Sequence, residues 1–240
     1  MGPVPIAGLT QDQGWALIEE MTSARNLLAY GDESLRSAPF IETTLDPILS
    51  LPSIGVEKLQ KLVLGVVRLD ETGAWPTFDE MRAYRHNLVA MHEATMEAIR
   101  ERTTSSSDFV REQVAAIDAD PVLPLLIATF DRYAREGRFY NLDRLAERRQ
   151  QEEKPYAYWS RVEHAVMTEE PIASMFAAAM ADNGNQALWD ELHASVQARV
   201  ADCLARWWDM ICWVGKNHAL GETGRTLAFE VDRKSVGRQR

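Results

Sequence analysis

The sequence has very little cysteine, and its two cysteines are placed so that they cannot pair. Cys203 and Cys212 are nine positions apart in a segment with helical periodicity. At about 100° per residue they face opposite sides of that helix, so a disulfide between them would require the helix to break. Two unpaired cysteines are typical of a reducing compartment, in which they pack as small apolar side chains.

Long hydrophobic runs and a targeting signal are absent too. No stretch reaches the roughly 18 apolar residues that a membrane-spanning helix needs, and residues 1–8 contain neither a basic segment nor an apolar run. These absences predict a cytoplasmic protein that does not enter a membrane. The net charge of −10 argues against general attraction to nucleic-acid phosphates. The one basic concentration is interpreted as part of a solvated tail: Arg233, Lys234, Arg238 and Arg240.

The motifs of several enzyme classes are also missing, namely the Gly-x-Ser-x-Gly turn, the phosphate-binding glycine loops and cysteine pairs at zinc spacing. Residues 92–96 begin like a zinc-protease motif, but Met96 stands where the second histidine is needed. We expect no metal and no cofactor. The alternative is a carboxylate and histidine site built from Glu163, Asp190 and His193 on a helical bundle.

Helical periodicity recurs along the whole chain. Strand patterns are weak, and 46% of the residues are hydrophobic, which is ordinary for a globular protein. Thr10 opens a helix with a capping box and Gly31 is predicted to end it. A helix that begins at Ser53 is apolar around most of its circumference, which predicts a central position. Gly55 and Gly65 lie inside it and predict close packing of a neighbour.

The second half continues in the same way. Thr77 opens a helix with another capping box, and this helix is predicted to run to Arg102, where a polar segment at 103–107 follows. A long final helix is predicted over 186–215. We therefore predict an all-α bundle of about seven to nine helices in one domain, 1–240. A subdivision into 1–102 and 108–240 is the alternative, and 221–240 is predicted to be a flexible tail.

Trp207 and Trp208 give the final helix an unusual character. Being adjacent, they point about 100° apart and cannot both face one core. Either one of them lies at an interface with a second subunit, or the helix is buried on two sides. A homodimer through this helix is the expectation that follows from the first alternative.

Two segments carry a resemblance to a known family. Residues 56–62 read Val-Glu-Lys-Leu-Gln-Lys-Leu, and after a short loop residues 85–88 read Arg-His-Asn-Leu. This pair of helices resembles the HEPN superfamily (higher eukaryotes and prokaryotes nucleotide-binding), over about residues 53–102. The resemblance implies a HEPN-like core with a C-terminal helical extension. Many members are metal-independent ribonucleases of toxin or defence type that work as dimers, so it also implies an RNA substrate.

The family's catalytic motif is an arginine, a polar residue and a histidine a few positions later. Here it matches Arg85, His86 and His92, which the resemblance therefore implies as catalytic residues. On the helix predicted to run to Arg102, Arg85 and His92 are seven positions apart, two turns on nearly the same face. Their side chains would then converge on one phosphodiester. Histidine can act as general base near neutral pH, and arginine stabilises the charge that develops on phosphoryl oxygens.

The alternative is a helical binding protein without chemistry. In that interpretation Leu88, Met91 and Thr95 form one buried ridge and His92 only borders the core. His86 would then bond a neighbouring helix, as a structural histidine does in non-catalytic relatives.

Overall fold

The computed structural model describes residues 6–38 and 41–237, and every regular element within them is a helix. The predicted all-α bundle is confirmed, with eleven α-helices in the described residues where seven to nine were expected. They are α1 (Gln11–Ser37), α2 (Ile41–Thr72), α3 (Phe78–Ala83), α4 (Leu88–Thr103), α5 (Asp108–Asp118), α6 (Val122–Arg135), α7 (Tyr140–Leu145), α8 (Pro155–Met167), α9 (Ile172–Ala181), α10 (Gln186–Lys216) and α11 (Gly221–Glu230). Two short 3-10 helices are η1 (Gly137–Phe139) and η2 (Arg233–Ser235).

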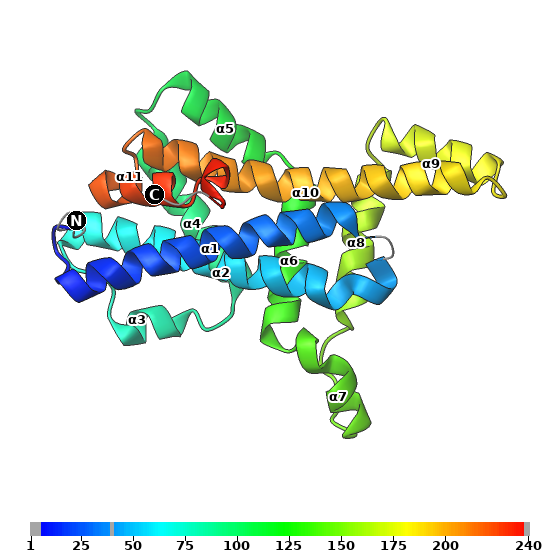
Figure 1. Cartoon of the computed structure of the whole chain (residues 1–240), viewed down its shortest axis with the longest axis horizontal. Coiled ribbons are helices and arrows are strands. Elements are labelled where there is room, and N and C mark those ends of the chain that lie inside the picture. The colour runs from blue at the N-terminus through cyan, green and yellow to red at the C-terminus, as the bar shows by residue number, and fades with distance from the viewer. Residues whose placement is uncertain (1–5, 39–40, 238–240) are drawn as a thin grey trace.

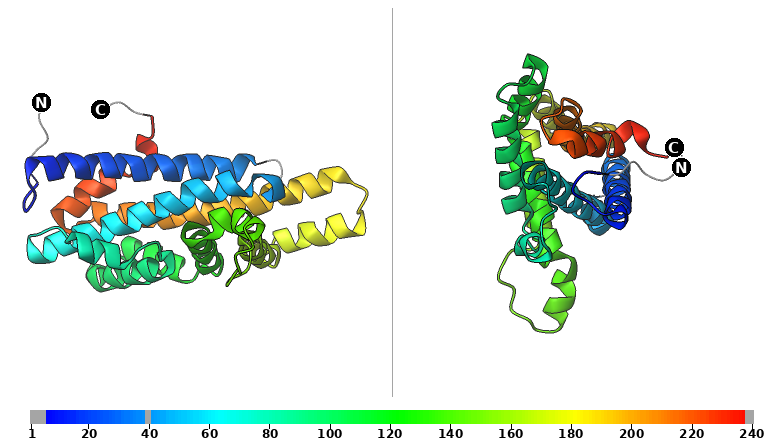
Figure 2. Two further views of the ribbon diagram at one scale, coloured as in Figure 1. Left: turned by 90° about the horizontal axis from the view of Figure 1, so that it is seen from below. Right: turned by 90° about the vertical axis from the view of Figure 1, so that its left-hand side faces the viewer.

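Three long helices, α1, α2 and α10, run along the long axis of the molecule (Figures 1 and 2). Helices α4 and α6 pack on α2, α8 packs on α6, and α11 lies against both α10 and α2. The hairpin of α9 and the start of α10 extends beyond the bundle at one end, and α7 projects to one side (Figure 1). The buried apolar residues form one cluster that includes both Leu17 and Val231, so it spans the polar segment at 103–107.

Two predicted helix boundaries are wrong where α1 and α2 pack closely: the end at Gly31 and the start at Ser53. Gly31 lies inside α1, where a Cβ would stand 2.7 Å from Cγ of Pro52. Helix α2 begins at Ile41 and continues through Pro47 and Pro52. A proline inside a helix costs about 3 kcal/mol, a loss that is offset by the burial of the apolar face along α2.

The neighbours expected at the glycines of α2 are confirmed. A Cβ on Gly55 would lie 2.9 Å from Cγ of Leu28 in α1, and a Cβ on Gly65 would lie 2.3 Å from the Trp75 ring. Both glycines therefore permit an approach that no larger residue would allow.

Helix α10 is buried on two sides. Trp207 and Trp208 are both buried within one chain, and the Trp208 indole N–H donates to the Val231 carbonyl at 2.7 Å. Neither ring is exposed to meet a second subunit. Cys203 and Cys212 are likewise buried, and both are free thiols.

Residues 221–237 are not the flexible tail that the sequence predicts. They form α11 and η2 because Leu227 and Val231 are buried apolar anchors. Arg233 pairs with Asp209 at 2.8 Å, which removes it from the predicted basic tail. Arg238 and Arg240 lie outside the described residues.

Within residues 6–38 and 41–237, no single helix is long and apolar enough to cross a membrane. Helices α5 and α6 reach that length and composition only together, across a bend of 64°.

Substituting alanine at two glycines of α1 tests its contact with α2. Alanine at a helical glycine normally stabilises by up to about 1 kcal/mol. We expect this for Gly14→Ala, whose Cβ would have its nearest neighbour 4.0 Å away. We expect Gly31→Ala to destabilise by about 1–3 kcal/mol because Pro52 must move. Urea unfolding of the two variants measures the difference, and equal effects would contradict the contact.

Candidate active site

The turn between α3 and α4 separates the residues that the sequence places on one helix. Thr77 caps α3 together with Glu80 as predicted, but the helix ends at Ala83. Helix α4 starts afresh at Leu88, because the side chain of Asn87 accepts the Ala90 N–H at 3.0 Å. The expectation that Arg85 and His92 share a helical face is therefore wrong.

Two features fix this turn. The buried carboxylate of Asp131, on α6, accepts the Leu88 N–H at 2.8 Å. Arg85 has a φ of +48°, a left-handed conformation that cannot continue a helix. The chain therefore changes direction at Arg85, and His86 turns towards α2.

His86 is held by a carboxylate of α2. Its Nδ1 lies 3.0 and 3.1 Å from the two carboxylate oxygens of Glu57. Glu57 also accepts from Lys61 Nζ at 2.6 Å, and the same ammonium donates to the Arg85 carbonyl at 3.1 Å. An ionised carboxylate can only accept, so Nδ1 carries a proton, and in the neutral ring Nε2 is then the acceptor.

His86 lines a cleft of about 310 Å³ between α1, α2, α6 and η1. The cleft is lined by Glu20, Ser50, Ser53, Ile54, Glu57, Lys58, Lys61, His86, Tyr133, Ala134 and Arg138. Tyr133 and Ser50 also line the cleft, and their hydroxyls share a hydrogen bond of 2.8 Å. Burial raises the pKa of Tyr133.

The cations around this cleft differ in how they are paired. Lys58 binds Glu20 at 2.7 Å and Lys61 binds Glu57, so both ammonium groups are neutralised. In the described part of the chain, the guanidinium groups of Arg85 and Arg138 make no ion pair, and Arg138 lies over the Phe139 ring at 5.2 Å. Arg138 therefore lines the cleft as an arginine without an acidic partner in a chain of net charge −10, which favours an anionic ligand there. Arg85 precedes His86 in the chain but is not among the residues that line the cleft.

His92 lies in a different cleft. This second hollow of about 470 Å³ is lined by α4, α5 and α6, and contains neither Arg85 nor His86. Nδ1 of His92 is buried without a hydrogen-bond partner, and the ring centroid lies 6.3 Å from that of Trp207. Burial, with a smaller effect of Arg100, lowers the pKa of His92 to about 4. The buried ridge of Leu88, Met91 and Thr95 is confirmed, and His92 borders it.

The structure does not assemble the carboxylate and histidine site considered as an alternative. Among the described residues, no group of three or more His, Cys, Asp and Glu side chains is placed to hold a metal ion. Glu163 instead accepts the Trp159 indole N–H at 2.7 Å, and Asp190 accepts from Gln186 at 2.8 Å.

Several residues of the His86 cleft escaped the reasoning from sequence. Glu57 stands in the segment that carries the family resemblance, and its spacing of four from Lys61 predicts an ion pair on one helical face. No such local signal exists for Tyr133 and Arg138, which reach the cleft through the packing of α6 on α2.

No protein-family model matches the chain, and neither a curated protein nor a solved structure shows significant similarity.

The lowered pKa of His92 predicts a loss of stability in acid. An exposed histidine has a pKa of about 6.5, so between that pH and about 4 the unfolded chain binds more protons than the folded chain. Stability conferred by the neutral ring is therefore present above pH 6.5 and is lost as the pH falls towards 4. From pH 7 to pH 5 we expect this residue to contribute a loss of about 2 kcal/mol.

Urea unfolding at both pH values measures that loss. In His92→Phe the decline should be smaller by this amount, whereas His218→Phe, at an exposed histidine, should decline like the parent. An identical pH dependence in all three proteins would show that His92 is not held neutral by burial.

Proposed function

We propose that the His86 cleft is the active site of a metal-independent endoribonuclease, the activity that the HEPN resemblance implies. The observation that carries the proposal is the contact of His86 Nδ1 with Glu57, which leaves Nε2 of the neutral ring as a base in a cleft that Arg138 also lines. The proposal keeps Arg85 and His86 from the residues predicted by sequence. It excludes His92, which lies in the other cleft.

The proposed reaction needs only the chain, its RNA substrate and water. Nε2 of His86 takes the proton from a ribose 2′-hydroxyl, and Glu57 stabilises the imidazolium that forms. The 2′-oxygen attacks the adjacent phosphorus, the bond to the 5′-oxygen breaks, and a 2′,3′-cyclic phosphate results. The departing 5′-oxygen takes a proton from solvent. Arg85 and Arg138 stabilise the charge on the phosphoryl oxygens.

The first test compares two histidines with nearly the same contacts. His218 also binds a glutamate through Nδ1, at 3.0 Å from Glu222, and it is 52% exposed where His86 is 54% exposed. His218 lines none of the clefts described above. We expect His86→Gln to lower the cleavage rate of single-stranded RNA by at least about a hundredfold, the usual contribution of a general base. His218→Gln should cleave like the parent.

Cleavage is followed with a labelled oligoribonucleotide, with and without chelator, and the cyclic phosphate end is identified by mass. Loss of activity in His92→Phe but not in His86→Gln would move the active site to the other cleft. RNA that binds without being cleaved would favour the non-catalytic binding protein.

The resemblance also implies a homodimer. Trp207 and Trp208 are buried and cannot form its interface, so the candidate surface is α9. Helix α9 has ten residues, none of them charged, and only Ile172 and Ala179 are buried. Phe176 and Met180 are exposed on the hairpin that extends beyond the bundle (Figure 1). Two chains of net charge −10 repel each other. An uncharged apolar face is where that repulsion is weakest, and we propose that two copies meet there.

Introducing charge on this face tests the dimer. We expect the double change Phe176→Glu with Met180→Glu to convert a dimer into a monomer, because two buried carboxylates per subunit would face each other. Leu145→Glu, at an exposed leucine on α7, should leave the dimer intact. Sedimentation at micromolar concentrations gives the mass. A monomeric parent would contradict the proposal.

A further inference from the structure

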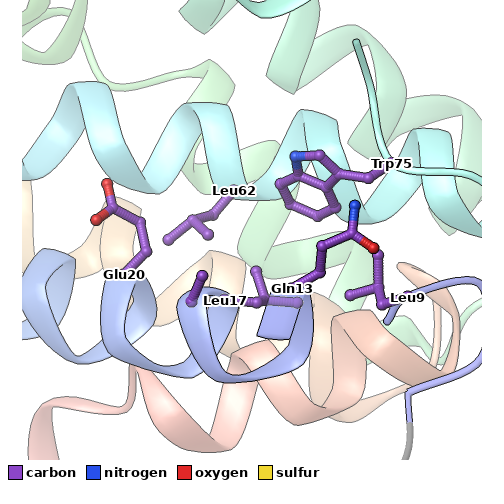
Figure 3. A pocket seen from close by; sticks show the side chains of 7 residues that line it. Leu9, Gln13, Leu17, Glu20, Leu62 and Trp75 are labelled. Carbon is purple, nitrogen blue, oxygen red and sulfur yellow. The ribbon is translucent and has the colours of Figure 1, made fainter. Parts of the chain in front are cut away.

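A third cavity lies beside the His86 cleft, between α1 and α2 (Figure 3). Its volume is about 320 Å³, which is within the range of small-ligand sites. Leu17 and Leu62 form its apolar floor, and both are buried. In Figure 3 Trp75 and Gln13 stand at one end of these leucines and Glu20 at the other.

The packing of Trp75 makes it a fixed wall of this cavity. Its ring lies directly on Gly65 of α2, so closely that a Cβ there would be 2.3 Å away. The chain reaches it through Gly73, whose φ of +72° makes the turn after α2. An indole held in place over leucine side chains is suited to a flat, unsaturated ring, as in the stacking of nucleobases on aromatic side chains.

The two polar ends of the cavity differ in hydrogen-bond character. Oε1 of Gln13 accepts the Thr10 N–H at 2.8 Å, which fixes the amide and leaves the two Nε2 hydrogens as donors for a ligand. Both carboxylate oxygens of Glu20 accept from Lys58 at 2.7 Å, and they retain lone pairs for further donors. The matching ring carries a carbonyl oxygen at one end and an amino group at the other.

The cavity is also joined to the proposed active site. Glu20 lines both hollows, and its partner Lys58 lies on the wall of the His86 cleft. Lys58 and Leu62 are one turn apart on α2, about 6 Å along the axis. A single nucleotide spans that distance, with its base in one hollow and its 3′-phosphate in the other.

We propose that this cavity binds guanine or cytosine, the bases with a carbonyl and an amino group at opposite ends of the Watson–Crick edge. It would thereby select the nucleotide on the 5′ side of the cleaved bond. The placing of the phosphate rests on the proposed ribonuclease function, whereas the binding of the base does not.

Calorimetry of the full-length chain with the four nucleosides and their 3′-monophosphates tests this inference. We expect guanosine and cytidine to bind at least about tenfold more tightly than uridine, which lacks the amino group, or adenosine, which lacks the carbonyl. Glu20→Gln should remove that preference, whereas Glu19→Gln, at an exposed neighbour outside the cavity, should keep it. Ala16→Phe, which fills the cavity from its exposed rim, should abolish nucleoside binding.

Two tryptophan variants separate loss of the binding site from loss of folding. Trp75→Ala should lose nucleoside binding, while Trp15→Ala, at an exposed tryptophan of α1 that does not line the cavity, should retain it. Equal affinity for all four nucleosides, no binding of any, or equal behaviour of Glu20→Gln and Glu19→Gln would overturn the inference. His86→Gln should bind nucleosides like the parent. Nucleoside binding without RNA cleavage would therefore refute the ribonuclease and leave the base site standing.

Discussion

The buried carboxylate of Asp131 is the constraint on which the site depends. Its bond to the Leu88 N–H reaches from α6 to the first residue of α4, between positions far apart in the sequence. A buried N–H without a partner costs about 1–3 kcal/mol, so this contact determines where α4 begins. Asn87 caps the same helix start, and the turn before it brings His86 to Glu57. The same bond separates Arg85 from His92.

The close approach of α1 and α2 supplies the other half of the site. Both proposed hollows have walls on these two helices, and Glu20 of α1 belongs to each of them. Gly31 against Pro52 and Gly55 against Leu28 set the spacing of the helices. The Lys58 to Glu20 pair then crosses the gap between them. A binding function for an RNA base and a catalytic function for its phosphate would thus share one structural foundation.

The sequence predicted the helical class and the sites where periodicity or capping acts locally. Both capping boxes and the final helix over 186–215 follow from neighbouring residues, and the structure has them. Prediction from the sequence failed where a residue far along the chain sets a helix boundary. Gly31 was expected to end a helix because nothing local shows that Pro52 lies against it. The helix from Thr77 was expected to reach Arg102 because Asp131 lies far along the chain from Leu88. Of the candidate residues, Arg85 and His86 remain in the proposed site, and Tyr133 and Arg138 enter it only through folding.

The imidazole resonances give the most direct test of which cleft binds RNA. The chain would be titrated with an oligonucleotide in which every sugar is 2′-deoxy, so that it cannot be cleaved, while the signals of the protein's five histidines are followed by NMR. The account predicts that the His86 signals shift on binding and that those of His92 and His218 do not. Shifts of His92 with an unchanged His86 would contradict it.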